Sequence, residues 1–347
     1  MNKNNKNILK IIKIYADKKE DKECKNCKGC KCSDKDKILV NNSLVNSANN
    51  KSSNNKNNNR DKITNKLNNI DKKLNKKFSK NSNPYLPKPY KVLEFYRETH
   101  DTFTLTVDMK IKHAPGQFVE VSVPGFGEAP ISICSYSNNY LKLNIREVGN
   151  VTNALAKLKK GNTILIRGPY GKGYPLESLK GKNLYIIGGG CGVAPLKGII
   201  EYAEMSRKHY KNISLFFGYC SYDDIIFKRE LIGWEKRHDV HLALDKKQQR
   251  GHMCYDATQG FITDALKQTE FPKKDNVAFL CGPPMMIKSV IELLKEKGFS
   301  DKDIYISAER LMYCAIGICC HCMIRGKYTC LDGPVFRYDE IKDLKND

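Results

Sequence analysis

The stretch Gly188-Gly-Gly-Cys-Gly-Val-Ala-Pro195 joins an apolar run at 183–187 to a helical pattern at 194–206, and it decides the fold class. Glycines at such a turn permit positive backbone φ and let peptide N–H groups approach a pyrophosphate at the helix N-terminus. A tight strand–helix turn without a ligand is the alternative when this stretch is taken alone. A second stretch, Cys281-Gly-Pro-Pro-Met-Met286, follows another apolar run and opens a helix with proline at the same sheet edge.

The two stretches together predict a dinucleotide crevice. Its predicted cofactor-binding residues are Gly188, Gly190, Cys191, Gly192, Ala194, Pro195, Cys281, Gly282 and Pro283.

Strands and helices alternate around these turns. The predicted strands are 183–187, 213–217, 240–244 and 276–281, and the predicted helices are 194–206, 225–234, 261–266 and 285–297. Strands that alternate with helices indicate a parallel sheet covered by helices on both faces. We therefore predict an α/β nucleotide-binding domain over residues 180–307.

Short alternating strands precede this domain. They are predicted at 91–96, 103–109, 117–123, 140–146 and 163–167, with one helix at 152–158. Regularly spaced short strands indicate a β-barrel or a sandwich, and we predict an antiparallel barrel over residues 83–179.

Three segments of the barrel are candidates for binding a second ligand. Residues 128–135 run into a strand, and the helix opened by Gly149 offers amides and the Thr152 hydroxyl to an anion. The turn Gly168-Pro-Tyr-Gly171 closes the barrel and would aim Tyr170 at the cleft between the domains. A β-edge turn, a helix cap and a tight turn are the purely structural alternatives for the three segments.

Four cysteines near the C-terminus have the spacing C-x4-C-x2-C-x7-C. They are Cys314, Cys319, Cys322 and Cys330, within a predicted cluster segment at 308–347. Four thiolates suit a [2Fe-2S] cluster or a zinc ion, but the first three spacings match the plant-type ferredoxin run. Structural zinc more often has two well-separated knuckles, so these cysteines are predicted as ligands of a [2Fe-2S] cluster.

The first 82 residues differ in composition from the rest of the chain. They hold 22 Lys and Arg but eight Asp and Glu, so they carry most of the net charge of +22, and they are rich in Asn. Such a segment buries too little apolar surface to fold, so we predict a disordered tail. Few aromatic residues interrupt its charges, which disfavours nucleic acid as a partner.

The tail also carries Cys24, Cys27, Cys30 and Cys32, which suit zinc, copper(I) or a further Fe-S centre, although no second half-site accompanies them. No export signal or membrane-spanning run is recognisable in the sequence, and its 14 cysteines are therefore expected as ligands or free thiols in a cytoplasmic protein.

The motifs, in this order, resemble the ferredoxin-NADP reductase superfamily, in which a flavin-binding barrel precedes a nicotinamide-binding domain. Further likenesses are Gly116-Gln-Phe-Val-Glu-Val-Ser-Val-Pro124, Val148-Gly-Asn-Val-Thr-Asn-Ala-Leu155 and Glu309-Arg-Leu-Met312. Versions with a C-terminal cysteine cluster include the dihydroorotate dehydrogenase electron-transfer subunit, the sulfhydrogenase gamma subunit and the corresponding subunit of anaerobic sulfite reductase. The chain looks most similar to the last of these, over about residues 83–345.

The resemblance implies an electron relay. NADH or NADPH would deliver hydride to FAD (FMN is left open), and the flavin would pass single electrons to the cluster and on to a catalytic reductase subunit of a hetero-oligomer. No catalytic acid, base or nucleophile is predicted, because cofactor placement governs such transfers. The implied flavin-binding residues are Pro130, Ile131, Ser132, Ser135, Gly149, Val151, Thr152, Asn153 and Tyr170.

The chain departs from the superfamily pattern in two motifs. Ala129 and Ile131 stand where the flavin motif usually has Arg and Tyr, which removes a cation and an aromatic ring. Ala315 and Cys320 stand where the cluster loop of these relatives usually has Gly. The segment Tyr219-Cys-Ser-Tyr-Asp-Asp224 holds no cation for a 2′-phosphate, which favours NADH over NADPH.

Two alternatives remain open at the level of sequence. The same relay would serve a hydrogenase or a dihydroorotate dehydrogenase equally well. A non-enzymatic metal- or nucleic-acid-binding protein on a reductase fold is the alternative from a different class, since a fold alone does not fix a function.

Overall fold

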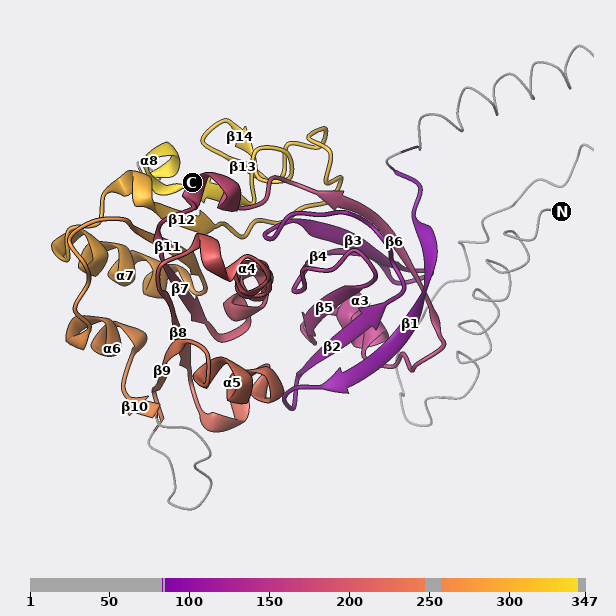
Figure 1. The fold of residues 1–347 in the computed structure, drawn as a ribbon. Coiled ribbons are helices and arrows are strands. Elements are labelled where there is room, and N and C mark those ends of the chain that lie inside the picture. Colours follow the sequence, from indigo (N-terminus) through magenta and orange to yellow (C-terminus); the bar gives the residue numbers. More distant parts are fainter. Residues whose placement is uncertain (1–82, 84, 247–256, 343–347) are drawn as a thin grey trace, which may run out of the picture. The chain divides into compact units, whose positions relative to one another are not determined.

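Two sheets organise the residues that the computed structural model describes, which are 83, 85–246 and 257–342 (Figure 1). The predicted disordered tail and its four cysteines lie outside the described residues. None of the helices in the described part of the chain is long and apolar enough to cross a membrane.

The first sheet is antiparallel and has the strand order β4-β3-β6-β1-β2-β5. Its strands are β1 (Lys88–Arg97), β2 (Thr102–Val107), β3 (Phe118–Val123), β4 (Gly127–Ser132), β5 (Leu141–Arg146) and β6 (Thr163–Tyr170). An antiparallel bridge between Ile133 and Leu143 joins the two edges, so the sheet curls into a barrel. Buried and less buried residues alternate along β5, as a strand with one face on a core requires.

The helix of the barrel, α3 (Asn150–Leu155), begins two residues before its predicted start and ends three residues before its predicted end. The Thr152 hydroxyl explains the early start, because its Oγ1 accepts the N–H groups of Val148 at 2.9 Å and Gly149 at 3.0 Å. This contact satisfies the N–H of the N-cap residue Gly149 and of the residue before it, and so fixes where the helix begins.

The second sheet has the order β10-β9-β8-β7-β11-β12-β15. Its strands are β7 (Asn183–Gly189), β8 (Ile213–Tyr219), β9 (Asp239–Leu244), β10 (Ala257–Gln259), β11 (Asn276–Cys281), β12 (Ile304–Ser307) and β15 (Val335–Arg337). The helices are α4 (Val193–Met205), α5 (Lys228–Glu235), α6 (Ile262–Gln268) and α7 (Pro284–Glu296), with a short α8 (Tyr338–Ile341) after β15.

The predicted alternation of strands and helices is confirmed, and the sheet is parallel from β10 to β12. The sequence did not indicate β10, β12 or β15, and β15 pairs antiparallel with β12. Helix α5 starts at Lys228 instead of residue 225, because Phe227 adopts a left-handed conformation with φ of 59° that a helix cannot include.

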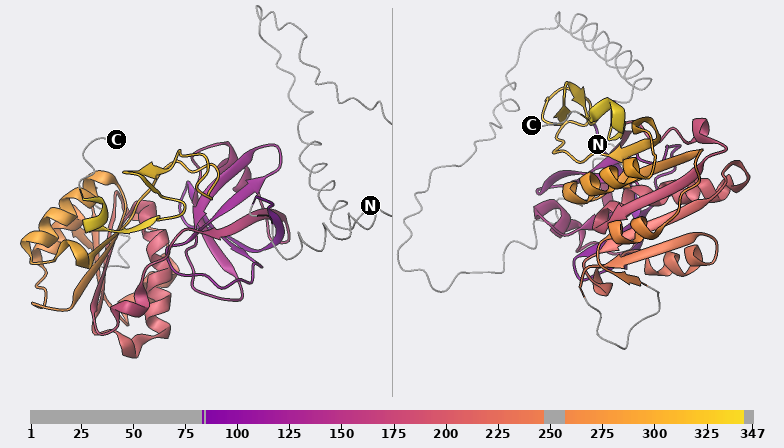
Figure 2. Two further views of the ribbon diagram at one scale, coloured as in Figure 1. Left: turned by 90° about the horizontal axis from the view of Figure 1, so that it is seen from above. Right: turned by 90° about the vertical axis from the view of Figure 1, so that its left-hand side faces the viewer.

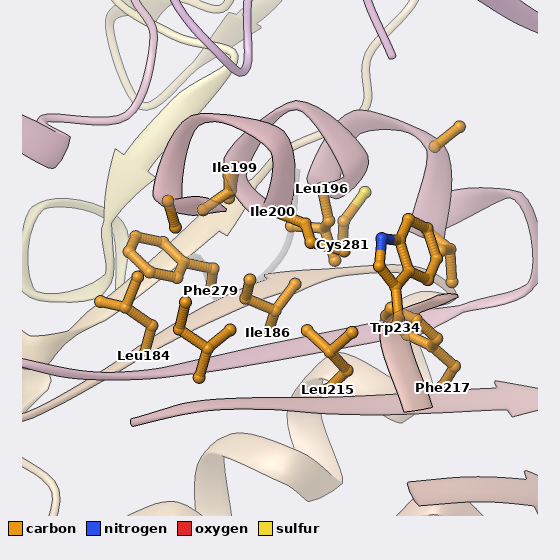
Figure 3. Close-up of a cluster of buried hydrophobic side chains, with 14 of the residues drawn as sticks. Leu184, Ile186, Leu196, Ile199, Ile200, Leu215, Phe217, Trp234, Phe279 and Cys281 are labelled. Carbon is orange, nitrogen blue, oxygen red and sulfur yellow. The ribbon is translucent and has the colours of Figure 1, made fainter. Parts of the chain in front are cut away.

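The core of this domain lies between α4 and the middle strands (Figure 3). Leu196, Ile199 and Ile200 of α4 face apolar side chains of β7, β8 and β11, and all are buried. Trp234 of α5 closes the cluster edge-to-face against Phe217, with ring centroids 6.0 Å apart. This packing holds the N-terminus of α4 above the carboxyl ends of β7 and β11.

Polar contacts fix the α/β domain to the barrel, and the described residues from Tyr85 onward belong to one compact unit. The Glu201 carboxylate on α4 pairs with buried Lys197 and accepts the N–H of Tyr136 from the barrel at 2.6 Å. The Glu98 carboxylate of the barrel accepts the N–H of Phe227 at 3.0 Å.

The C-terminal segment (yellow) passes from the seven-stranded sheet to the barrel (Figure 2). It contributes β15 to the sheet, and its Gly333 carbonyl accepts the N–H of Lys172 just after β6. Before these contacts in the sequence it forms a two-stranded hairpin of β13 (Met323–Ile324) and β14 (Lys327–Tyr328). The predicted domain limits at residues 180 and 308 stay predictions.

Candidate functional site

The glycine-rich turn packs directly against the turn after β11. A Cβ added to Gly192 would lie 2.5 Å from the carbonyl oxygen of Cys281 and 2.7 Å from Cα of Gly282. Gly190 adopts a φ of +55°, which L residues rarely adopt. The two stretches predicted to act together therefore meet backbone to backbone, and only glycine fits at Gly192.

A pocket of about 650 Å³ opens beside the meeting point. The predicted residues that line it are Gly190, Cys191, Gly192, Gly282 and Pro283. Gly188, Ala194, Pro195 and Cys281 are buried instead, and none of them is among the lining residues. Burial raises the pKa of the Cys281 thiol to about 12, so this cysteine is a neutral wall residue.

Three charged residues of the pocket were missed by the sequence analysis: Arg146 from β5, Asp245 after β9 and Glu309 after β12. Asp245 follows a predicted strand directly, and that position was the available signal. Arg146 belongs to the barrel and carried no such signal. Glu309 stands in the family likeness at 309–312, but β12 before it was not predicted. Arg146 also pairs with Asp101 at 2.7 Å, which anchors the barrel side of the pocket.

The ion pair affects the ionisation of Asp101. Desolvation opposes the ionised form, but hydrogen bonds from Arg146, Thr102 and Thr99 outweigh it and lower the pKa of Asp101 to about 2. Asp101 is therefore a fixed negative charge at neutral pH.

Two segments that carry predicted flavin residues lie side by side. Pro130, Ile131 and Ser132 lie half-buried on β4, which is an edge strand. Val151 of α3 lies over the start of this strand, because a Cβ added to Gly127 would meet its Cγ2 at 3.5 Å. A Cβ added to Gly149 would meet nothing within 4 Å, so the space in front of α3 is open. Strand β4 and helix α3 thus form one open shelf.

Other predicted flavin residues have internal partners. The Thr152 hydroxyl donates to the Gly149 carbonyl at 3.0 Å in addition to capping the helix. Asn153 is exposed on α3, and its N–H donates to the Gly149 carbonyl at 2.8 Å. Ser135 is fully buried, and its hydroxyl oxygen accepts the N–H of Lys142 at 2.9 Å.

Tyr170 lies against the cysteine segment. Its ring packs at 5.9 Å from Phe118, and both contact a buried cluster that includes Cys322 and Cys330. Tyr170 is therefore a wall of the cysteine site, and its place at an interdomain cleft stays a prediction.

Backbone N–H groups point at the cysteine sulfurs. Gly317 donates to Cys330 Sγ at 3.2 Å, and Ile318 donates to Cys314 Sγ at 3.4 Å. The hairpin fixes the last two cysteines, because the Thr329 hydroxyl donates to the Cys322 carbonyl at 2.7 Å. Its turn places Arg325 and Gly326 at positive φ, as a two-residue hairpin loop requires.

The thiols form two pairs with different surroundings. In the first pair the Cys319 N–H donates to Cys314 Sγ at 3.5 Å, and in the buried pair Cys322 donates to Cys330 at 3.4 Å. The N–H of His321 is the main cause that lowers the pKa of Cys319 to about 7. Burial, together with the bond from Cys322, raises the pKa of Cys330 to about 12.

The donor set fits an iron–sulfur cluster. In the described residues no three His, Cys, Asp or Glu side chains meet the geometry expected around a single metal ion. A binuclear cluster takes two thiolates on each iron, and the thiols form two pairs joined by one loop. N–H groups aimed at sulfur stabilise the negative charge that such a cluster carries.

Comparison with known proteins agrees with these two sites. Residues 186–292 match the family model of the oxidoreductase NAD-binding domain. Residues 309–342 match the iron–sulfur cluster binding domain of dihydroorotate dehydrogenase B.

Two curated relatives cover most of the chain. Sulfhydrogenase 2 subunit gamma of Pyrococcus furiosus is 38% identical over 278 residues, which are 74% of this chain and 96% of the relative. The electron transfer subunit of dihydroorotate dehydrogenase B (NAD(+)) from Clostridium perfringens is 31% identical over 257 residues, 73% of this chain and 96% of the relative.

A solved structure supports the fold. An NADH-dependent reduced ferredoxin-NADP oxidoreductase aligns with a TM-score of 0.59 and 23% identity, over 74% of this chain and 92% of that chain.

The chain belongs to the ferredoxin-NADP reductase-like NAD-binding family, whose members include sulfhydrogenase gamma subunits and the electron-transfer subunits of dihydroorotate dehydrogenase B. It is an oxidoreductase subunit with an NAD-binding domain and an iron–sulfur binding segment. The predicted superfamily is confirmed, and the likeness to the anaerobic sulfite reductase subunit stays a prediction.

Proposed function

We propose that the chain is an electron-transfer subunit that takes hydride from NADH and delivers single electrons to a catalytic partner. The observation that carries this proposal is that one barrel contacts both sites. Arg146 of β5 lines the nucleotide pocket, whereas Arg167 and Tyr170 of β6 contact the cysteine segment.

In this proposal the pocket beside Gly190 and Gly192 binds the dinucleotide, and β4 with α3 binds FAD. A bound flavin supplies the conversion between two-electron and one-electron transfer. The chain's own residues bind and orient the cofactors. Since Ala129 carries no charge, main-chain groups of the shelf take a larger share in binding the flavin phosphates.

We propose a [2Fe-2S] cluster on Cys314, Cys319, Cys322 and Cys330, with the half-exposed pair on one iron and the buried pair on the other. The thiol pairing and the N–H groups directed at sulfur support a cluster over zinc.

We propose NADH as the donor because the two cations that follow the segment 219–224 are already engaged. Lys228 lies 5.0 Å from the ring centre of Tyr222, and Arg229 lies 3.6 Å from that of Tyr96. The pocket itself offers Asp245 at the carboxyl end of β9. A carboxylate at this edge suits a ribose hydroxyl and repels a 2′-phosphate.

Large apolar side chains surround the cysteine loop and mark the exit for electrons. Leu311 is 72% exposed, Ile318 65% and Tyr313 57%. Apolar residues exposed together indicate a surface that a protein partner covers. Anaerobic sulfite reductase, a hydrogenase and a dihydroorotate dehydrogenase are the candidate partners, and reconstitution with each catalytic subunit would identify the acceptor.

Two variants of neighbouring cysteines test the relay. Replacing the proposed ligand in Cys319→Ser should abolish the cluster EPR signal and electron delivery to a one-electron acceptor, while NADH still bleaches the flavin. Cys320→Ser is the matched control and should keep the cluster. A full cluster signal in Cys319→Ser would overturn the ligand assignment, and a colourless wild-type protein would overturn the relay.

A further inference from the structure

One buried arginine connects the proposed flavin shelf to the cysteine loop. The side chain of Arg167 on β6 is 4% exposed. Its Nε and Nη2 donate to the two carboxylate oxygens of Glu128 at 2.8 and 2.6 Å. Its Nη1 donates to the Cys314 carbonyl at 2.7 Å, and Nη2 reaches the Tyr313 carbonyl at 3.3 Å.

The partners of this guanidinium belong to two segments that are far apart in sequence. Glu128 lies on β4, two residues before the first of the residues proposed to hold the flavin, and its Oε1 also accepts the Ser122 hydroxyl at 2.6 Å. Cys314 opens the loop that carries three of the four predicted ligands. Arg167 therefore joins two segments that are 186 residues apart in sequence at their Glu128 and Cys314 contacts.

A second carboxyl group lies opposite Arg167. Glu120 of β3 pairs in register with Arg167 on one side and with Pro130 of β4 on the other. The Glu120 residue is 1% exposed, and its Oε1 has no hydrogen-bond partner among the described residues. The guanidinium is thus the main source of positive charge beside the Glu128 carboxylate and the Glu120 carboxyl group, whose burial favours its neutral form.

We propose that Arg167 is a positioning residue that holds the cluster loop in fixed register with the flavin strand and sets the electrostatic field at the cluster. The proposal rests on the proposed function. Only a guanidinium serves it, since its planar fork binds Glu128 at one edge and the loop carbonyls at the other. A buried positive charge beside the loop favours the reduced, more negative cluster and so raises its reduction potential.

The first test uses Arg167→Lys and Arg167→Met, with Arg337→Lys as the matched control. Arg337 forms the same kind of two-point contact with Asp339, at 2.6 and 3.0 Å, away from the cysteine loop. In the holoprotein the cluster potential should fall furthest in Arg167→Met, which removes the charge. It should fall less in Arg167→Lys, which keeps a charge but cannot hold both Glu128 and the loop carbonyls. The flavin potential of these variants, and both potentials of Arg337→Lys, should stay at wild-type values. An unchanged cluster potential and EPR spectrum in Arg167→Lys would overturn the proposal.

The second test needs no cofactor. In metal-free protein, limited proteolysis within residues 309–321 should be about tenfold faster in Arg167→Lys, because charge-assisted hydrogen bonds that close the loop are lost. Arg337→Lys should be cleaved at the wild-type rate. Equal cleavage of the wild type and all variants within residues 309–321 would overturn the positioning role of Arg167. Because this result does not depend on a bound cluster, the positioning role and the proposed function can fail separately. If Arg167→Met does not fold, Arg167→Lys decides both tests.

Discussion

Adding a single methyl group at Gly192 should displace the wall of the nucleotide pocket and leave the rest of the fold intact. Gly192 has φ of −63°, which alanine adopts without strain, so Gly192→Ala adds only a steric conflict. The new Cβ would lie 2.5 Å from the Cys281 carbonyl oxygen and 2.6 Å from its carbonyl carbon. Real Cβ atoms do not approach backbone so closely, and the turn after β11 must therefore move.

The loss of stability in Gly192→Ala can be compared with the effect of Gly198→Ala, a matched control on α4. Inserting a methyl group into packed structure costs about 1–3 kcal/mol, which lowers Tm by about 2–4 °C per kcal/mol in a protein of this size. Gly198→Ala places its Cβ 3.4 Å from the Ser135 carbonyl oxygen, an ordinary contact. That variant should gain up to about 1 kcal/mol from helix propensity.

Thermal unfolding and NAD(+) titration by calorimetry measure both consequences. We expect Gly192→Ala to lower Tm by several degrees and to weaken dinucleotide binding about tenfold or more, since the displaced turn forms the pocket wall. Gly198→Ala should bind as the wild type does. Wild-type Tm and affinity in Gly192→Ala would refute the argument that backbone contact between the two turns shapes the pocket.

Three further predictions follow from individual residues. Burial is the main cause that raises the pKa of Glu120 from 4.5 to about 8. The stability that protonated Glu120 contributes is therefore fully present below about pH 4.5, and it is lost as the pH rises through about 8. Glu120→Gln should therefore gain stability relative to wild type between about pH 5 and about pH 9, and parallel Tm profiles would contradict this. Cys320 is exposed with φ of 62°, so Cys320→Gly should stabilise the loop by about 0.5–1 kcal/mol, as measured by urea unfolding. Ala315 also has a positive φ, of 60°, but its buried methyl group contributes about 0.8 kcal/mol, so Ala315→Gly should leave the free energy of unfolding nearly unchanged. An equal gain in stability in Cys320→Gly and Ala315→Gly would show that burial of the Ala315 methyl group is unimportant.

Local patterns predicted much of this fold. Strand β5 could be placed within a few residues from its alternating pattern, and β7, β8 and β11 from their short apolar runs. The glycines before α4 could be recognised because a turn that lets a phosphate approach needs them. The cysteine spacing likewise reflects local loop geometry.

Contacts between distant segments could not be predicted in the same way. Strand β15 pairs with β12 only because the cysteine segment folds back onto the sheet, and its three residues carry no periodic signal. The contact between Arg167 and the Cys314 carbonyl crosses 147 residues, and a buried arginine in a strand looks like any other polar residue in sequence. The late start of α5 depends on the left-handed conformation of Phe227. A phenylalanine disfavours this conformation locally, so tertiary packing imposes it.

The most direct test of the relay is an anaerobic titration of the purified chain with NADH, followed by visible and EPR spectra. A flavin takes two electrons and a [2Fe-2S] cluster takes one, so full reduction should need about 1.5 equivalents of NADH and give a cluster EPR signal. An endpoint at about one equivalent with no EPR signal would mean that the four cysteines hold zinc or nothing, and would contradict the account.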